Sequence, residues 1–564
     1  MTEPFPPLNR RIAELVRQAL MDAQKSGALP QFALPEITVE HPRQAGRGDF
    51  ASSVALQLAS VVHRAPIQIA RTIVDHLPPS PLFGSAEAAP PGFVNFTLDP
   101  AWLASQVPVI LEAGQRFGAL AMGQGRRVQV EYVSANPTGP LTMGSGRNAV
   151  LGDGLANVLE AAGYQVQREY YVNDRGTQTG LFAETLFARY AQALGHTEEQ
   201  MPENGYHGHY MVELGQQIAA DDGDRYLRLP REQAMAELGR IGLERMVESI
   251  RTDLAFVGIS YDRWFSEVSL YEDGAWEEAY RILQESGLVE EREGAVWFLA
   301  SRFDVAKDEV LIRTDGRPTY FGSDVAYHYD KFCRRGFDWV IDVWGADHQG
   351  HVPRMKAVMQ AFSLDPERLT LLLYQLVTLR RGGELVRLSK RTGDIITLRE
   401  VVEEIGADAV RFFLLSRAAD SQMDLDLDLA KEQSNENPVY YVQYAHARIA
   451  SILRNAAETE GVVDPETAEV ALLTHPSEQA LIRQMLQLPE IVEMAAAKLA
   501  PHHLAYYASE LASSFHAFYR DCRVLSSDPA DAPLTAARLQ LVRAAKGVLA
   551  RVLTLMGMTA PESM

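Results

Sequence analysis

The sequence predicts an α/β fold: a Rossmann-like domain with a parallel sheet in the middle of the chain, an α+β domain before it and an all-α helical bundle after it. Two strand–loop–helix patterns with glycine-rich loops indicate the central domain, since such units build parallel sheets. Amphipathic helices mixed with a strand-like segment precede it, and helical periodicity runs almost unbroken after it. We expect the three domains to span residues 1–118, 119–434 and 435–564.

The composition bounds the class of protein. A chain of 564 residues is too long for one hydrophobic core, and 47% hydrophobic with 23% charged residues is typical of a soluble globular protein. No apolar stretch approaches about 18 residues, and the N-terminus lacks a secretion-signal pattern. The two cysteines, Cys333 and Cys522, lie far apart and suit a reducing compartment. We therefore expect a cytoplasmic protein with no membrane partner and no structural metal.

The formal net charge of −21 argues against a broad nonspecific nucleic-acid surface, because phosphate binding needs clustered cations. It is compatible with a shaped local RNA site, since local patches matter more than the total charge. We therefore expect no DNA partner.

The first domain combines helices with a strand. Ile12, Leu15, Val16 and Leu20 recur at helical spacing, and a second amphipathic run covers residues 52–77. Residues 78–92 are rich in proline, glycine and alanine and predict a turn that leads into the strand FVNFTL at 93–98. A helix at about 100–114 would connect to the central domain.

The central domain begins at the strand VQVEYV (128–133), which precedes a proline- and glycine-rich loop and a helix that Gly163 would terminate. The strand YQVQREYYV (164–172) follows. A second unit comprises the strand WVIDVW (339–344), the loop GADHQG and a helix at 352–362. Ligands of open parallel sheets bind at the C-terminal ends of strands, where both loops would lie. Between the two units, residues 180–300 predict a mostly helical insertion.

Two loops have the composition of phosphate-binding segments. Ala135–Ser145 precedes a helix, so its backbone N–H groups can approach a phosphate, although an ordinary turn would show the same pattern. Neither a Walker-type loop nor a dinucleotide fingerprint occurs. Arg387–Gly393, after the turn Arg381–Glu384, presents Lys390 beside a serine and a glycine. Such a loop can supply positive charge to a polyphosphate, although a basic loop is often only a solvated surface.

A third set of residues, around predicted strand ends, suits a cationic ligand. Tyr320, Asp324, Asp347 and His348 belong to TYFGSD and WGADHQG. Carboxylates pair well with a guanidinium or an ammonium group, and bidentate geometry favours guanidinium. Each residue alone is better explained by a structural role, but their joint occurrence around predicted strand ends indicates a binding site.

Taken together, these segments resemble the arginyl-tRNA synthetases of bacterial type, a family of class I aminoacyl-tRNA synthetases. The resemblance follows the family's order over nearly the whole chain: GDFASSVALQLA and PGFVNF in the N-terminal domain, VEYVSANPTGPLTMGSGRNAVLGD around the HIGH motif, EYYVNDRGTQ, VLIRTDGRPTYFGSDVAYHYDKF and DVWGADHQGHVPRMKA in the amino-acid-binding stretches, RLSKRTGDIITLREVVEEIGADAVRFFLL at the KMSKS loop, and NENPVYYVQYAHARI and LMGMTAPESM in the anticodon-binding domain.

The resemblance implies an enzyme that activates L-arginine with Mg²⁺–ATP and transfers it to the terminal adenosine of tRNA(Arg). Residues 119–434 would then be the catalytic domain, and the protein would be a monomer. The family usually needs bound tRNA before it activates arginine, and we expect the same here by resemblance.

Site residues carry over position by position. The arginine contacts would be Glu131, Asn136, Tyr320, Asp324 and Asp347. ATP would contact Gly144, Gly345, His348, Arg387, Leu388 and Lys390, with Thr142, Ser145, Ser389 and Lys390 in catalytic positions. The outer corner of the tRNA would meet Phe93 and Asn95, and the anticodon would stack on Tyr440, Tyr441 and Tyr444, although tyrosines at helical spacing are as often core residues.

The sequence departs from the family where Thr142 and Ser145 replace the two histidines of the HIGH motif. A hydroxyl can donate one hydrogen bond but carries no charge, and losing one donor to a developing oxyanion can cost about 3 kcal/mol. Arg147 and Lys390 are the remaining candidate cations. We hypothesise that Lys390 and Mg²⁺ carry most of the phosphate charge.

Three rival interpretations stay open at this point. Another class I synthetase, for cysteine or glutamate, would lack the N-terminal domain and the Tyr320–Asp324 pair. A noncatalytic tRNA-binding relative is suggested only by the missing histidines. A regulatory scaffold has no sequence feature in its favour.

Overall fold

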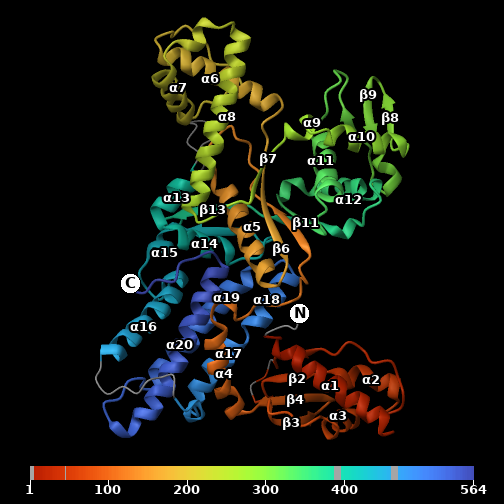
Figure 1. The fold of residues 1–564 in the computed structure, drawn as a ribbon, viewed down its shortest axis with the longest axis vertical. Coiled ribbons are helices and arrows are strands. Elements are labelled where there is room, and N and C mark those ends of the chain that lie inside the picture. Colours follow the sequence, from red (N-terminus) through yellow and green to blue (C-terminus); the bar gives the residue numbers. More distant parts are fainter. Residues whose placement is uncertain (1–4, 43, 45, 387–395, 459–467) are drawn as a thin grey trace.

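The structure is a computed structural model that describes residues 5–42, 44, 46–386, 396–458 and 468–564. The molecule is elongated, with a helical insertion at one end, the N-terminal domain and the C-terminal helices at the other, and a parallel sheet between them (Figure 1). Across these residues, every helix is too short or too polar to cross a membrane.

The N-terminal domain packs three helices on a four-stranded antiparallel sheet of order β1-β2-β4-β3. The predicted stripe is confirmed for Ile12, Val16 and Leu20, which are buried. The amphipathic run breaks into two helices because His63 adopts a left-handed φ of 54° and Pro66 starts the next helix. The elements are α1 (Leu8–Lys25), β1 (Val39–Glu40), β2 (Phe50–Ser52), α2 (Val54–Val62), α3 (Pro66–Asp75), β3 (Phe83–Ala89) and β4 (Phe93–Leu98).

The expectation of a turn over residues 78–92 is wrong for its middle part. Residues Phe83–Ala89 form strand β3, which pairs with β4. Pairing with an apolar neighbour overrides the weak strand propensity of glycine and alanine here.

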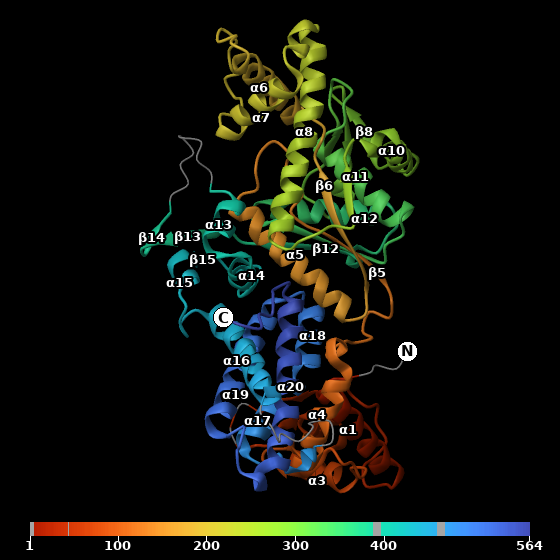
Figure 2. The ribbon, with the colours of Figure 1, turned by 60° about the vertical axis from the view of Figure 1, so that its left-hand side comes forward.

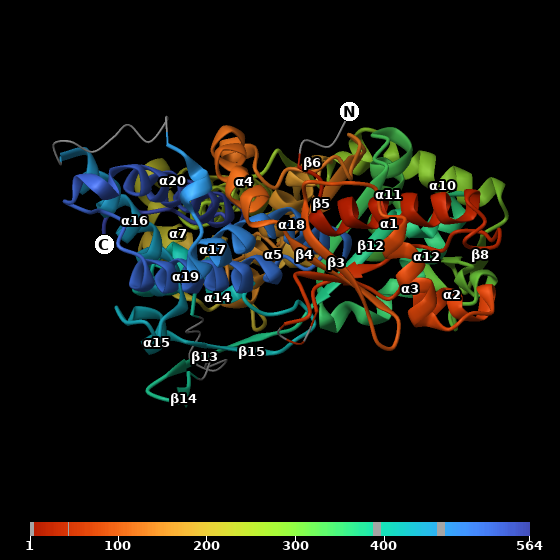
Figure 3. The same ribbon diagram turned by 90° about the horizontal axis from the view of Figure 1, so that it is seen from below.

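Helix α4 (Pro100–Ala113) links the first domain to the centre, with Asp99 capping it by accepting a bond from the Trp102 N–H. It packs against two helices near the end of the chain, α17 (Pro476–Leu486) and α20 (Ala532–Leu555) (Figures 2 and 3). The first and third domains are also joined by ion pairs, including Asp49–Arg483 at 2.7 Å.

The central sheet is parallel, in the order β12-β11-β5-β6-β7. The strand order reverses between β11 and β5, and this switch point is where ligands bind in such sheets. Both predicted βαβ units are present. Their elements are β5 (Arg127–Glu131), α5 (Met143–Ala161), β6 (Gln165–Val172), β7 (Arg263–Ser266), β11 (Trp339–Gly345), α12 (Val352–Ala361) and β12 (Leu369–Tyr374).

The insertion is helical only in its first part. Strand β7 returns the chain to the central sheet, and a small antiparallel sheet of order β10-β9-β8 follows, so the expectation for residues 180–300 is partly wrong. The elements are α6 (Thr177–Ala193), α7 (His209–Asp222), α8 (Arg231–Phe256), α9 (Ser269–Glu272), α10 (Ala275–Glu285), β8 (Val289–Arg292), β9 (Ala295–Phe298), β10 (Glu309–Ile312), α11 (Tyr320–Tyr329) and a π-helical turn, η4 (Asp330–Arg334).

A three-stranded sheet, β14-β13-β15, and three helices follow β12. The predicted turn at Arg381–Glu384 is present, and Gly382 and Gly383 supply its positive φ angles of 60° and 76°. The elements are β13 (Val377–Arg381), β14 (Glu384–Leu385), α13 (Leu398–Ile405), α14 (Ala407–Leu415), β15 (Met423–Asp426) and α15 (Leu427–Lys431).

The C-terminal domain is the expected helical bundle, joined to the centre by a buried arginine. Arg411 of α14 pairs with Asp153 of α5 and donates to the carbonyls of Met556 and Val257. Its guanidinium fills the space that a side chain at Gly557 would need. The remaining helices are α16 (Pro438–Glu458), α18 (Leu488–Ala497) and α19 (His502–Asp521).

Candidate active site

The HIGH-type loop (Ala135–Ser145) leads into the N-terminus of α5 at the switch point. Thr142 is the N-cap residue, and its hydroxyl oxygen accepts a bond from the Ser145 N–H at 3.5 Å. Gly144 and Ser145 form the first turn and are half-buried. Because the first backbone N–H groups of a helix lack intrahelical partners, this end of α5 suits an anion.

The predicted KMSKS-type loop (Arg387–Gly393), with Arg387, Leu388, Ser389 and Lys390, lies outside the described residues. The segment that follows it contacts the HIGH-type loop. The Leu398 N–H donates to the Leu141 carbonyl at 2.8 Å. Thr397 caps α13 and forms a β-bridge with Thr142, so the start of α13 is held beside the start of α5.

Gly345 ends strand β11, and Asp347 and His348 lie in the short helical turn after it, Ala346–His351. Asp347 is 83% exposed and lies 3.6 Å from His348, which is half-exposed. Burial raises the pKa of Tyr374, and the nearby Asp347 carboxylate adds to that shift. No described contact joins Asp347 to Glu131 or Asp324.

Arg147 does not serve as a phosphate cation, and that expectation is wrong. It is 1% exposed and donates to the carbonyls of Gln375, at 2.6 Å, and Ala418, at 2.8 Å. The guanidinium therefore ties α5 to two loops of the domain. Asn148 acts similarly, bonding the Val133 N–H and the Val343 carbonyl across the switch point.

Tyr320 and Asp324 lie on helix α11 and not at a strand end as predicted. They are one helical turn apart, so their side chains share a face. Tyr320 is 48% exposed at the mouth of the site. Burial raises the pKa of Asp324 to about 7; His328 opposes this shift, and Glu131 and Glu267 add to it.

Glu131 ends strand β5 and is fixed by two donors. Lys331 donates to its Oε2 at 2.6 Å, and the Ser134 hydroxyl donates to its Oε1 at 2.9 Å. Ser134 and Val133 have φ angles of 42° and 69°, a strained conformation of the kind found at binding sites. Asn136, in the same loop, is exposed and donates to Gln178 at the start of α6.

Glu267 is a site residue that the sequence reasoning missed. It follows β7 at the C-terminal edge of the sheet and is 4% exposed. Its Oε1 accepts a bond from Ser323 at 2.7 Å, whereas its Oε2 has no hydrogen-bond partner within the described ranges. Burial raises its pKa. The available signal was the glutamate directly after RWFS, but that strand was assigned to a helical insertion.

A pocket of about 360 Å³ opens beside Glu267 and Tyr320. Three arginines line it: Arg175, Arg313 and Arg317. The Arg175 guanidinium lies 3.7 Å from the centre of the Tyr271 ring. In the part of the chain that the structure describes, neither Arg175 nor Arg313 forms an ion pair within 4.0 Å, whereas Arg317 pairs with Asp315 at 3.6 Å.

The candidate tRNA residues lie far from this site. Phe93 and Asn95, on β4, line a pocket of about 450 Å³ together with His41 and Arg47. Tyr440 and Tyr444 stack on α16 with ring centroids 5.6 Å apart. The Tyr441 hydroxyl donates to Ser513 at 3.2 Å, and Arg448 lies 4.6 Å from the Tyr444 ring centre. All three tyrosines are half-buried.

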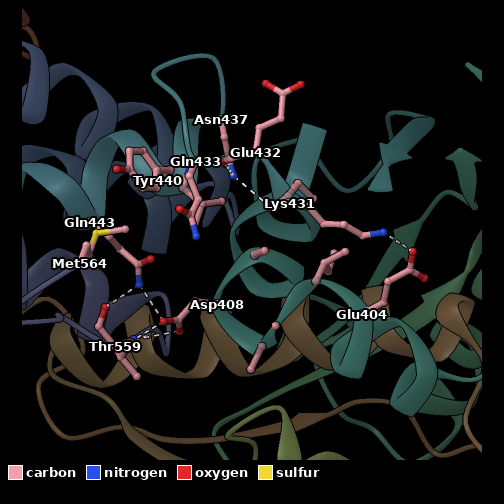
Figure 4. Close-up of a pocket in the computed structure, with 16 residues that line it drawn as sticks. Glu404, Asp408, Lys431, Glu432, Gln433, Asn437, Tyr440, Gln443, Thr559 and Met564 are labelled. Atoms are coloured by element: carbon pink, nitrogen blue, oxygen red, sulfur yellow. Dashed lines mark hydrogen bonds and ion pairs between the residues drawn. The ribbon is translucent and has the colours of Figure 1, made fainter. Parts of the chain in front are cut away.

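A further cleft, of about 550 Å³, separates α13 and α14 from α16 (Figure 4). Asp408 accepts bonds from Gln443 and Thr559, and Lys431 pairs with Glu404 at 2.6 Å. Several of its polar side chains bond to one another, and among the described residues none of those predicted to bind arginine or ATP lines it. The cleft therefore marks the junction of the catalytic and C-terminal domains.

Family profiles match three successive segments. They are described as an arginyl tRNA synthetase N terminal domain at residues 10–98, a catalytic domain of tRNA synthetases class I (R) at 106–424, and a DALR anticodon binding domain at 442–564. Among solved structures, an arginyl-tRNA synthetase of Thermus thermophilus has a TM-score of 0.75 at 24% identity, covering 99% of this chain and 100% of its own. That of Plasmodium falciparum scores 0.74 at 18% identity over 99% and 100%. These likenesses establish the fold.

Sequence relatives establish the family. The arginine–tRNA ligase of Dehalococcoides mccartyi is 52% identical over 553 residues, 98% of each chain. That of Carboxydothermus hydrogenoformans is 47% identical over 559 residues, 99% of each chain. With the N-terminal domain, the parallel catalytic sheet and the helical anticodon-type domain in the same order, the chain belongs to the arginyl-tRNA synthetase family.

Proposed function

We propose that this enzyme attaches L-arginine to tRNA(Arg) with ATP, and that Asp324 and Glu267 select arginine through its guanidinium. The observation that carries this proposal is the free Oε2 of buried Glu267, beside an Asp324 whose pKa burial raises to about 7. Neither carboxylate forms an ion pair within 4.0 Å among the described residues, although Arg175 lowers the pKa of Glu267 and His328 lowers that of Asp324. Such carboxylates favour a cationic ligand, and planar acceptors suit a guanidinium. Tyr320, at the mouth, lies over the bound side chain.

The strand order gives arginine a direction in the site. Glu131 ends β5, next to the phosphate side, and Glu267 follows β7, two strands away. Two strand spacings amount to about 10 Å, roughly the reach of an extended arginine. Glu131 and Asn136 therefore hold the α-ammonium end, which leaves the carboxylate facing ATP. In this arrangement Asp347 acts at the edge between arginine and ATP.

The first step is attack of the arginine carboxylate on the α-phosphate of Mg²⁺–ATP, giving arginyl-adenylate and pyrophosphate. The N-terminus of α5, with Thr142, Gly144 and Ser145, takes the phosphates together with Gly345 and His348. Lys390, with Arg387, Leu388 and Ser389, brings the positive charge that Thr142 and Ser145 lack. Positioning and charge stabilisation suffice, so no covalent nucleophile is needed.

In the second step a ribose hydroxyl of the terminal adenosine attacks the activated carbonyl. Arg175, Arg313 and Arg317 surround the entrance near Tyr320 and attract the phosphates of the incoming strand. Phe93 and Asn95 contact the outer corner of the tRNA, where a ring beside an amide suits an unpaired base. Tyr440, Tyr441 and Tyr444 stack on anticodon bases.

We further propose that the protein acts as a cytoplasmic monomer on tRNA, with no DNA or membrane partner, and that activation needs tRNA. The domain boundaries at about residues 118 and 434 are part of the same proposal.

One assay tests the function. Purified protein is incubated with ATP, tRNA and a panel of amino acids that includes arginine, lysine, citrulline and cysteine, and charging of tRNA is measured. We expect charging with arginine alone, and arginine-dependent ATP formation from pyrophosphate only when tRNA is present. Charging with a different amino acid, or none at all, would refute the proposal.

A further inference from the structure

Three acidic residues form a row across the central strands. Asp342 of β11, Glu131 of β5 and Glu169 of β6 are register partners, so their side chains lie on one face of the sheet. Asp342 and Glu169 are fully buried, and Glu131 nearly so. Like charges at neighbouring positions repel strongly away from water, so this acid row needs compensating cations.

Helix α11 and the π-helical turn η4 supply those cations. Asp324, His328, Lys331 and Arg335 follow one another at spacings of four, three and four residues, which places them on one helix face. Arg335 pairs with Glu169 and with Asp330. Lys331, with no exposed surface, donates to Glu131 at 2.6 Å and to Asp342 at 2.8 Å. The π-turn, a rare feature, lies where these cations must reach the sheet.

His328 is hydrogen-bonded within the same cluster. Its Nδ1 lies 2.8 Å from the Asp324 carbonyl oxygen and its Nε2 lies 2.9 Å from the Asp342 carboxylate. Burial opposes ionisation of Asp342, but Lys331 and the contact with His328 hold its pKa at about 2. Lys331 is thus the buried cation that Glu131 and Asp342 share.

From this arrangement we infer that Lys331 is a positioning residue of the amino-acid site, which fixes Glu131 so that its carboxylate reads the α-ammonium of arginine. The inference rests on the proposed function and adds the residue on which recognition of the amino group depends. Lys331 is too deeply buried to touch the substrate, so it acts through Glu131. The Ser134 bond alone leaves Oε2 of Glu131 without a donor.

The test compares arginine with 5-guanidinopentanoate, which lacks the α-amino group. Binding of each to wild type and to Lys331→Met is measured by calorimetry with tRNA present. We expect Lys331→Met to weaken arginine binding by roughly 30-fold or more, since it removes one partner of a buried charge pair. The analogue should bind both proteins within about twofold. Equal weakening of both ligands, or of neither, would overturn the inference.

Two further variants separate positioning from folding. Lys331→Met/Asp342→Val replaces the buried ion pair by apolar side chains, which commonly restores stability lost on breaking such a pair. We expect it to regain thermal stability yet keep the weak arginine binding, whereas recovery of arginine affinity would overturn the inference. Lys356→Met, at a partly exposed lysine that bonds the Pro366 carbonyl, is the matched control and should bind both ligands as wild type does. A wild type that charges no tRNA with arginine would refute the proposed function instead.

Discussion

In the proposed site, the half that would hold the amino acid (the amino-acid half) and the half that would hold the phosphates (the phosphate half) are built on opposite principles. In the amino-acid half, Glu131, Asp342 and Lys331 are buried and bonded to one another before any substrate arrives. In the phosphate half, Ser145 is half-buried and Asp347 is exposed, and the groups facing outward are hydroxyls and helix N–H groups. Selecting one amino acid requires preset charges in a dry pocket, whereas ATP brings its own metal and tolerates a more open site.

The largest expected effect comes from a substitution in the amino-acid half, at Asp324. Asp324→Asn keeps the size of the side chain but removes a charge that the guanidinium needs. We expect kcat/KM for arginine to fall by roughly 100- to 1000-fold, or about 3 to 4 kcal/mol, with the KM for ATP little changed. Asp315→Asn, an exposed carboxylate near the same pocket, is the control and should charge tRNA normally. A similar loss in both variants would contradict the assignment.

The next effect tests the phosphate half. Lys390→Ala should slow arginine-dependent ATP formation from pyrophosphate, measured with tRNA present, by roughly 100-fold, because a charged donor to the developing oxyanion is lost. Arginine binding should not change, which separates this variant from Asp324→Asn. Exposed Lys307→Ala is the matched control. An unchanged rate of ATP formation from pyrophosphate would show that groups other than Lys390 neutralise the phosphate charge.

The pH dependence of arginine binding should arise in the amino-acid half. Burial raises the pKa of Asp324 to about 7, and a bound cation favours its ionised form. Affinity is therefore full above about pH 7 and falls by up to tenfold per pH unit below it, as arginine must displace a proton. Calorimetry between about pH 5.5 and about pH 8.5 measures this. The Asp324→Asn variant should show a flatter profile, and a flat wild-type profile would exclude Asp324 as the titrating group.

The smallest effect distinguishes the two hydroxyls of the HIGH-type loop. Thr142 is the N-cap of α5, so Thr142→Ala should lower the stability of the catalytic domain by about 1 kcal/mol and its melting temperature by about 2 to 4 °C. Ser145→Ala removes a hydroxyl that caps nothing, so we expect a higher KM for ATP at an unchanged melting temperature. Equal decreases in melting temperature for the two variants would contradict this division of roles between Thr142 and Ser145.

The sequence was a reliable guide to the architecture. Periodicity and loop composition located both βαβ units, because strands that end in glycine-rich loops before helices have few alternative folds. The sequence patterns did not predict strands that form only by pairing with a partner strand elsewhere in the chain. β3 is poor in strand-forming residues and exists by pairing with β4, and β7 is short and lies inside a helical region.

The same limits applied to the site. Motif order made Asp324 and Glu131 candidates, but the lysine that pairs with Glu131 comes from the π-helical turn after α11, about 200 residues later in the sequence. No local sequence pattern predicts that Lys331 bonds to Glu131. None predicts that Arg147 donates its hydrogen bonds to backbone carbonyls. Glu267 was missed because its strand was missed. The assignments of individual ATP and tRNA contacts stay predictions.

The position of helix α4 bears on how the protein is made. Its apolar residues Leu103, Val107 and Ile110 are buried, and the helix packs against α17 and α20. α4 ends at Ala113 and α20 at Leu555, so 442 residues (555 − 113) separate their ends. At about 5 to 20 residues per second, the ribosome delivers the missing partner roughly 20 to 90 s later. During synthesis the apolar face of α4 therefore stays exposed until α20 has been made. We expect a chaperone that acts on the nascent chain to bind this face.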